Sequence, residues 1–305
     1  MDVEHPPPPP RRRVPTGLPD AIRAAAQRTL DEELDTRGDL TSAAVVPASA
    51  VARAEVVAGA AGVLAGTAAF TAVVDLVDPR VAAAFFVEEG TRVEAGTAVG
   101  ALAGPLRSIL SAREAALGLL GHLSGIATRT RVLADAVEPS GGVVCPAPPS
   151  TPGLRLLEHA AVIAGGGAAA LRIGLHDGLL VTAEHAAGAR SLRAATRWAI
   201  AAAHVWAVQV EVHTESDLDA ALAAGARQLR LADHDPNLLA PLLARARDAE
   251  AQLGGVGIEV VLPTTGSVEV ARELAELGVD RLAAPLLGPP LPVTLRVVLA
   301  DDVED

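Results

Sequence analysis

The sequence predicts an α/β protein with an amino-terminal α/β sandwich-like domain and a carboxy-terminal α/β barrel. From Gly141 onward, short apolar segments alternate with helical segments rich in Ala and Leu, which is the pattern of parallel strands joined by helices. Between residues 51 and 102, short strand-like segments are instead separated by glycine turns. A length of 305 residues accommodates two modest domains and allows a large core.

The elements can be assigned in chain order from their apolar spacing and their end signals. Residues 18–34 have the spacing of an amphipathic helix, and residues 67–77 and 107–137 are also expected to be helical. A last apolar strand is expected at 292–299. The expected barrel strands are 142–145, 179–182, 205–212, 228–231, 257–262 and 281–284, with helices such as 215–224 and 267–277 between them.

These assignments divide the chain into a tail and two domains. Residues 1–17 contain five consecutive prolines and three arginines without the apolar segment of a secretory signal, so we expect a disordered tail. Residues 18–115 are assigned to the amino-terminal α/β domain and residues 116–289 to the α/β barrel domain. Residues 290–300 are expected to return to the amino-terminal domain.

The composition argues against several classes of protein. A formal net charge of −12 does not suit a nucleic-acid surface, because phosphate contacts need clustered cations. The single cysteine, Cys145, excludes an internal disulfide and a cysteine-based zinc cage, which fits a cytoplasmic location. The uncharged run 56–74 is interrupted by glycines, so no membrane span is expected. No His, Cys and carboxylate cluster has metal-site spacing.

All 25 basic residues are arginines, because the sequence contains no lysine. The chain therefore has no amine for a Schiff base and no compact ammonium to place on a phosphate. The glycine spacing of residues 90–102 also suits a lipoyl or biotinyl carrier domain. A carrier of that kind needs a lysine at its hairpin tip, so this alternative is excluded.

The most informative stretch runs from Ser150 to Asp177. Thr151 is expected to cap a helix with Pro152 at its first position, and three glycines at 165–167 are expected to stop it. Arg172 follows the glycines.

Three segments together resemble the nicotinate-nucleotide pyrophosphorylase family, also called quinolinate phosphoribosyltransferase. They are Gly-Asp-Leu-Thr-Ser at 38–42, Leu-Ser-Gly-Ile-Ala-Thr-Arg-Thr at 123–130, and the Pro-capped helix with its three glycines. The resemblance covers roughly residues 18–299. It implies a homodimer and a reaction of NAD synthesis that joins quinolinate to phosphoribosyl pyrophosphate, normally with Mg²⁺, and releases CO₂.

Most of the cations that this family uses are replaced in the present chain. Pro148 and Pro149 stand where the family has Arg-Lys ahead of the helix, and Thr182 stands for a strand-end lysine. Proline offers neither a charge nor an amide N–H. Further replacements are His159 for a lysine, Leu171 for a histidine, Gln209 for an acid, Ala232 for an aspartate, prolines at 263 and 285 in the glycine-rich loops, and an inverted Arg113-Glu114 pair.

Four residues remain as candidates for a substrate site, and no residue is assigned as catalytic. Arg155 either pairs along its helix or binds substrate, and Arg172 either pairs with Asp177 or forms a remnant anion site. Glu211 lies in an apolar strand, where an unpaired carboxylate is costly, so it needs a partner or a site role. His185 is either a core histidine or a ligand.

On this resemblance we expect a homologue of quinolinate phosphoribosyltransferase that has lost catalysis and binds a small anion or a partner protein. The alternative is an active enzyme that forms nicotinate mononucleotide, with Mg²⁺ as its cofactor. Each lost charge-assisted contact is worth about 1.5–3 kcal/mol, so losing four of them corresponds to a roughly 10⁴- to 10⁸-fold lower rate. Non-additivity of the four contacts reduces this factor.

Overall fold

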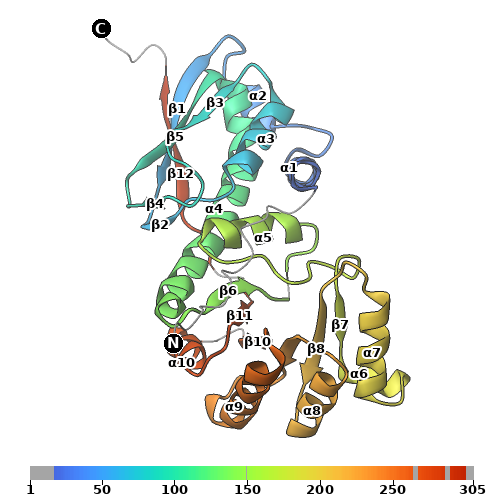
Figure 1. The fold of residues 1–305 in the computed structure, drawn as a ribbon. Helices are drawn as coiled ribbons and strands as arrows, with labels where there is room; N and C mark the ends of the chain where they lie inside the picture. Colours follow the sequence, from blue (N-terminus) through green and yellow to red (C-terminus); the bar gives the residue numbers. More distant parts are fainter. Residues whose placement is uncertain (1–16, 149, 264–266, 286–288, 300–305) are drawn as a thin grey trace. The chain divides into compact units, whose positions relative to one another are not determined.

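The computed structural model describes residues 17–148, 150–263, 267–285 and 289–299 (Figure 1). The tail predicted at 1–17 therefore lies outside the described residues, apart from Gly17. The chain forms two compact units. Among these residues, the antiparallel unit comprises 17–131, 150–166 and 289–299, and the parallel unit comprises 132–148, 167–263 and 267–285.

A four-stranded antiparallel sheet forms the centre of the antiparallel unit. Its strand order is β12-β1-β5-β3, so the last strand of the chain pairs with the first. The strands are β1 (Val51–Ala58), β3 (Ala82–Phe85), β5 (Ala98–Pro105) and β12 (Val293–Leu299), and a separate pair is formed by β2 (Gly62–Val63) and β4 (Arg92–Val93). The helices of this unit are α1 (Leu18–Leu34), α2 (Leu40–Val45), α3 (Thr67–Val77), α5 (Arg155–Ala164) and the first part of α4 (Leu106–Val137).

Small aliphatic side chains fill the core of this unit, since the chain has few aromatic residues. Phe70 on α3 is fully buried and packs edge-on against Phe85 of β3, with ring centroids 5.3 Å apart. Around it lie buried Ala, Val and Leu side chains from the sheet and from α4. The predicted domain boundary between residues 115 and 116 falls inside α4, which continues to Val137.

Six parallel strands form the sheet of the parallel unit, in the order β6-β11-β10-β9-β8-β7. They are β6 (Val143–Pro146), β7 (Leu179–Val181), β8 (Val208–Val212), β9 (Gln228–Leu231), β10 (Gly257–Val261) and β11 (Arg281–Ala284). The connecting helices are η1 (Glu138–Ser140), α6 (Ala183–Gly188), α7 (Leu192–Ala202), α8 (Glu215–Ala223), α9 (Pro236–Leu253) and α10 (Val268–Glu276). The predicted α/β fold is thus confirmed, although among the described residues no pairing closes β6 onto β7.

The two faces of the parallel sheet differ in polarity. Leu229, Leu231 and Ile258 point to one face and are fully buried. The alternate residues form what we call the inner face, which carries the register partners Glu211 (β8), Arg230 (β9), Glu259 (β10) and Arg281 (β11) and also Cys145 (β6). Charged side chains therefore lie side by side within the sheet.

Two predicted element boundaries are wrong. Helix α5 begins at Arg155, and Thr151 does not cap it, because the turn 151–154 precedes it and the Thr151 N–H donates to Glu158. Strand β8 begins at Val208 rather than at 205. Residues 203–206 instead form a turn, in which the Trp206 N–H donates to the Ala203 carbonyl, so the strand begins only after this turn.

The first glycine after α5 is required by the close approach of α4. A β-carbon at Gly165 would overlap the carbonyl oxygen of Ala127 and would lie 2.7 Å from Cβ of Thr130. Gly166 adopts a φ of 94°, which only glycine tolerates readily. The glycine run therefore lets one helix end directly against the other.

A buried carboxylate also joins α5 to α4. The side chain of Glu158 is 6% exposed and lies 3.0 Å from Nε2 of His122, while the Thr151 N–H donates to its other oxygen at 3.0 Å. Burial raises the pKa of Glu158, but the hydrogen bonds from His122 and Thr151 outweigh it and lower the pKa below its ordinary value.

None of the described helices is both long enough and apolar enough to cross a membrane.

We expect Glu158→Gln to reduce the free energy of unfolding by about 1–3 kcal/mol, because His122 and Thr151 lose a charged acceptor. A lowered pKa means that this stabilisation is complete above the ordinary value of 4.5 and is lost as the pH falls through the lowered pKa. Urea unfolding of the wild-type and Glu158→Gln proteins at neutral and at acidic pH measures this difference in the free energy of unfolding. Glu114→Gln, which changes an exposed glutamate of α4, is the control, and equal losses in the two variants would contradict the role of Glu158.

Candidate functional site

The loops that follow the carboxyl ends of parallel strands are where such sheets carry their functional groups. The described residues in these strand-end loops are 147–148, 182–185, 213–214, 232–235, 262–263 and 285. Their charged side chains are the carboxylates Glu184, Asp233 and Asp235, together with three histidines, and no arginine is present among them. The described strand ends thus repel a polyanion more than they attract it.

His185 is exposed and serves as a helix-capping residue, so the core alternative for it is wrong. Its Nδ1 accepts from the backbone N–H of Thr182 at 3.2 Å and lies 2.8 Å from Oγ1 of Thr182. Thr182 also donates to Glu184 at 2.6 Å, and this hydrogen bond lowers the pKa of Glu184. The segment that replaces the family's strand-end lysine is therefore a local network at the start of α6.

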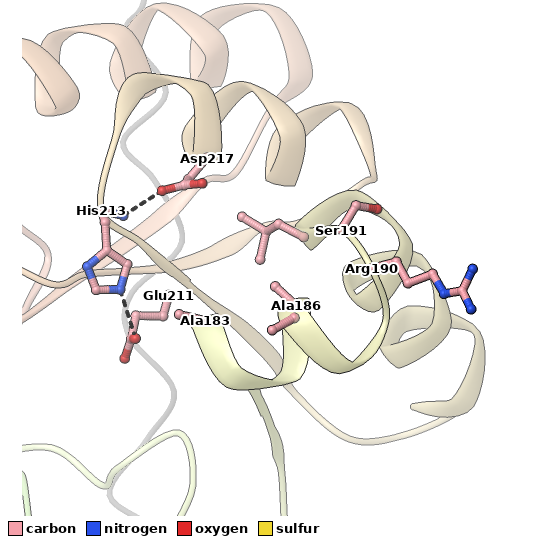
Figure 2. Close-up of a pocket in the computed structure, with 9 residues that line it drawn as sticks. Ala183, Ala186, Arg190, Ser191, Glu211, His213 and Asp217 are labelled. Carbon is pink, nitrogen blue, oxygen red and sulfur yellow. Dashed lines mark hydrogen bonds and ion pairs between the residues drawn. The ribbon is translucent and has the colours of Figure 1, made fainter.

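Glu211 lines a pocket of about 350 Å³ between β8, α6 and the residues before α7 (Figure 2). One oxygen of Glu211 lies 3.0 Å from Nε2 of His213, which gives this carboxylate the partner that its position requires. Three alanines and Leu192 supply the apolar part of the lining. The volume is at the small end of the range for ligand pockets.

The remaining charges of this pocket do not form an anion site. Asp217 accepts hydrogen bonds from the backbone N–H and the hydroxyl of Thr214 at 3.0 and 2.9 Å, as the cap of α8. Arg190 is exposed, and its guanidinium points away from Glu211 and His213 (Figure 2). The pocket contains two carboxylates and is therefore better suited to a neutral or cationic group.

Arg172 lies in the segment before β7 and is half-buried. The carboxylate of Asp177 accepts from the backbone N–H groups of Ile173 and Gly174 at 3.0 and 2.9 Å, and it forms no ion pair with Arg172. The guanidinium of Arg172 is thus a cation that Asp177 does not neutralise.

Arg155 belongs to the antiparallel unit, whereas Arg172, His185 and Glu211 belong to the parallel unit. Its side chain is exposed, and its Nε donates to the hydroxyl of Ser150 at 3.1 Å. Of the four candidates, the structure therefore brings three into one unit.

A second pocket, of about 500 Å³, lies in the antiparallel unit and is lined by the Gly-Asp-Leu-Thr-Ser segment. The carboxylate of Asp39 caps α2 by accepting from the Ser42 N–H at 2.9 Å, and the hydrogen bonds from Ser42 lower the pKa of Asp39. Arg113 also lines this pocket and pairs with the adjacent Glu114 at 2.7 Å. Arg113, the cation among the described residues that line this pocket, is thus already paired with Glu114.

The described carboxylates of the parallel unit do not form a metal cage of their own. Glu211 is bonded to His213, and Asp233 accepts from the backbone N–H groups of His234 and Asp235, which lowers the pKa of Asp233. Within the described ranges, no group of three or more His, Cys, Asp or Glu side chains is arranged to hold a metal ion. A Mg²⁺ ion carried by a substrate pyrophosphate needs only one or two protein carboxylates, because phosphate oxygens and waters supply its other ligands.

The sequence interpretation missed the paired charges on the inner face. Arg230 contacts Glu259 at 2.8 Å, and Nε of Arg281 lies 3.4 Å from the other oxygen of Glu259. The signal that could have found them is the one that singled out Glu211, a charged residue inside a short apolar strand.

Comparisons with known proteins agree on one family. The model for the quinolinate phosphoribosyl transferase C-terminal domain matches residues 126–288, and the model for the N-terminal domain matches residues 39–124. A nicotinate-nucleotide pyrophosphorylase [carboxylating] of Mycobacterium leprae is 35% identical over 274 residues, which cover 88% of this chain and 93% of that protein. A probable enzyme of the same name from Bacillus subtilis is 37% identical over 196 residues, covering 64% and 67%.

A solved structure shows the same likeness over nearly the whole chain. The nicotinate-nucleotide pyrophosphorylase of Francisella tularensis superposes with a TM-score of 0.84 at 25% identity, covering 94% of this chain and 98% of that one.

We expect the thiol of Cys145 to be unreactive in the folded protein. Burial and the negative charge of Glu259 raise its pKa to about 12, so the thiolate is scarce at neutral pH, and the side chain is fully buried. Alkylation by iodoacetamide at pH 8, followed by mass spectrometry, should label the protein in denaturant and leave the native protein unlabelled. Rapid labelling of the native protein would show that the inner face opens to solvent.

Proposed function

This chain belongs to the quinolinate phosphoribosyl transferase family, and from that premise we propose that it has lost phosphoribosyl transfer and binds a small anion near Arg172. The observation that supports this proposal is the charge of the strand-end loops. The family reaction brings a dicarboxylate and a pyrophosphate together, and preorganised cations are the main resource for stabilising that charge. The described strand-end loops instead carry three carboxylates and no arginine.

The proposed loss of phosphoribosyl transfer is supported by the replaced residues as well as by the negative charge of the strand-end loops. Pro148 and Thr182 stand at the described strand ends where the family has an arginine and a lysine, and Pro149 lies outside the described residues. Thr182 and His185 are bonded to each other, so neither is held in place for a substrate phosphate. We infer that the fold persists because it depends on glycines and apolar side chains, which this chain retains.

The second candidate is an active transferase. It is favoured by the 35% identity to the Mycobacterium leprae protein over 88% of the chain. In that case Mg²⁺ as cofactor would be held by the substrate pyrophosphate, and the carboxylates of Glu211 and Asp233 would be the protein ligands available to it.

We expect the purified protein, mixed with quinolinate, phosphoribosyl pyrophosphate and Mg²⁺, to form nicotinate mononucleotide at least about 10⁴-fold more slowly than an active family member. Chromatographic detection of the nucleotide measures this, with an active relative as the positive control. Turnover at ordinary enzyme rates that is lost in Arg172→Ala would falsify the proposal and establish the second candidate.

The anion site near Arg172 has its own test. At about ten times its Kd, phosphate or pyrophosphate should raise the Tm by roughly 3–6 °C, and Arg172→Ala should lose this shift. Arg197→Ala removes an exposed arginine of α7 in the same unit and should keep it. If neither these anions nor pyridine carboxylates stabilise the wild-type protein, a scaffold that binds a partner protein replaces the anion-binding function.

We further propose a homodimer, as the family resemblance implies, in the cytoplasm, where a single reduced cysteine is stable. Light scattering coupled to size exclusion should then give twice the 30.9 kDa of one chain. A mass of one chain at micromolar concentration would contradict the dimer.

A further inference from the structure

Three charged side chains are paired on the inner face of the parallel sheet, within the strands rather than at their ends. The side chain of Glu259 is 3% exposed, and its register partners are Arg230 on β9 and Arg281 on β11. Nε and Nη2 of Arg230 donate to Oε1 of Glu259 at 3.1 and 2.8 Å. Nε of Arg281 donates to Oε2 at 3.4 Å.

The charges of this cluster do not balance. Two guanidiniums with side chains 19% and 9% exposed share the single carboxylate of Glu259. Glu211 is the register partner of Arg230, but its carboxylate is bonded to His213 instead. Each oxygen of Glu259 is thus held by a different guanidinium, so that two arginines converge on one carboxylate.

A thiol and a side-chain amide share the inner face with this carboxylate. Sγ of Cys145 lies 3.6 Å from Oε2 of Glu259. On the same face, Gln209 is 3% exposed, and its Nε2 is buried without a hydrogen-bond partner. Arg281 also donates from Nη2 to the carbonyl of Ala169 at 2.5 Å. The inner face is therefore rich in donors for an acceptor such as a carboxylate.

We propose that Arg230 and Arg281 form a binding site for a small monocarboxylate and that Glu259 is its permanent, built-in occupant. Free anions are excluded from the inner face because the carboxylate of the chain itself fills the position between the two guanidiniums. The site goes beyond the proposed function and does not rest on it, since it is built from residues of three strands and uses neither Arg172 nor the strand-end loops.

The test removes the carboxylate of Glu259 by substitution and supplies free formate in its place. In Glu259→Ala, 100 mM sodium formate should lower the equilibrium constant of urea unfolding about tenfold, relative to sodium fluoride at the same ionic strength, if formate binds with a Kd about one tenth of that concentration. Wild-type protein and Glu273→Ala, which removes an exposed glutamate of α10, should show no such difference. The double variant Glu259→Ala/Arg281→Met should lose the effect, because one of the two guanidiniums is gone.

Two outcomes would overturn the proposal. One is a formate effect of equal size in wild type, Glu273→Ala and Glu259→Ala, which would show a general salt effect. The other applies if Glu259→Ala does not fold by itself, in which case its refolding yield is measured in formate and in fluoride. A higher yield in formate supports the site, and equal yields in the two salts refute it.

Discussion

The ion pairs of Glu259 with Arg230 and Arg281 link three adjacent strands of the parallel unit through buried charge. A carboxylate that is 3% exposed loses most of its hydration, and burial is tolerated only when ion pairs and hydrogen bonds replace it. Because the three residues come from three adjacent strands, the pairing fixes the register of β9, β10 and β11. Through the carbonyl of Ala169, Arg281 also holds the segment that follows the glycine run.

The family fold and the strand-end chemistry of this protein are separable for a physical reason. The fold depends on buried Ala, Val and Leu, and on glycines such as Gly165 that allow helices to approach closely. Strand-end side chains contribute little to that core, so they can change without unfolding the chain. In this chain the strand-end residues Thr182 and His185 bond to each other.

Electrostatics within the parallel unit follow the same division. Inside the sheet, two arginines share the carboxylate of Glu259, and at the strand ends carboxylates accept local capping and turn bonds, as at Asp233. The carboxylate of Asp177 bonds to backbone N–H groups and forms no ion pair with Arg172, which is the observation behind the anion site proposed beside Arg172. The absence of lysine makes every such site depend on the planar geometry of guanidinium groups.

The sequence alone determined the elements whose ends are marked by strong local signals. The bounds of α1, α3, β9 and β11 agree with the predicted ranges, because apolar spacing and flanking glycines or charges act over a few residues. Alternating strands and helices also sufficed to predict the parallel unit. The cap of α5 was mispredicted, because the Thr151 N–H bonds to Glu158, whose position is set by His122 on another helix.

Only the tertiary structure decided which charges meet. The spacing of Arg230, Glu259 and Arg281 along the chain holds no sign that they pair, since the pairing follows from strand order and register. The partner of Glu211 was likewise open until the structure placed His213 beside it. Local propensity reaches a few residues along the chain, whereas the free energy of a buried charge depends on whatever the fold packs around it.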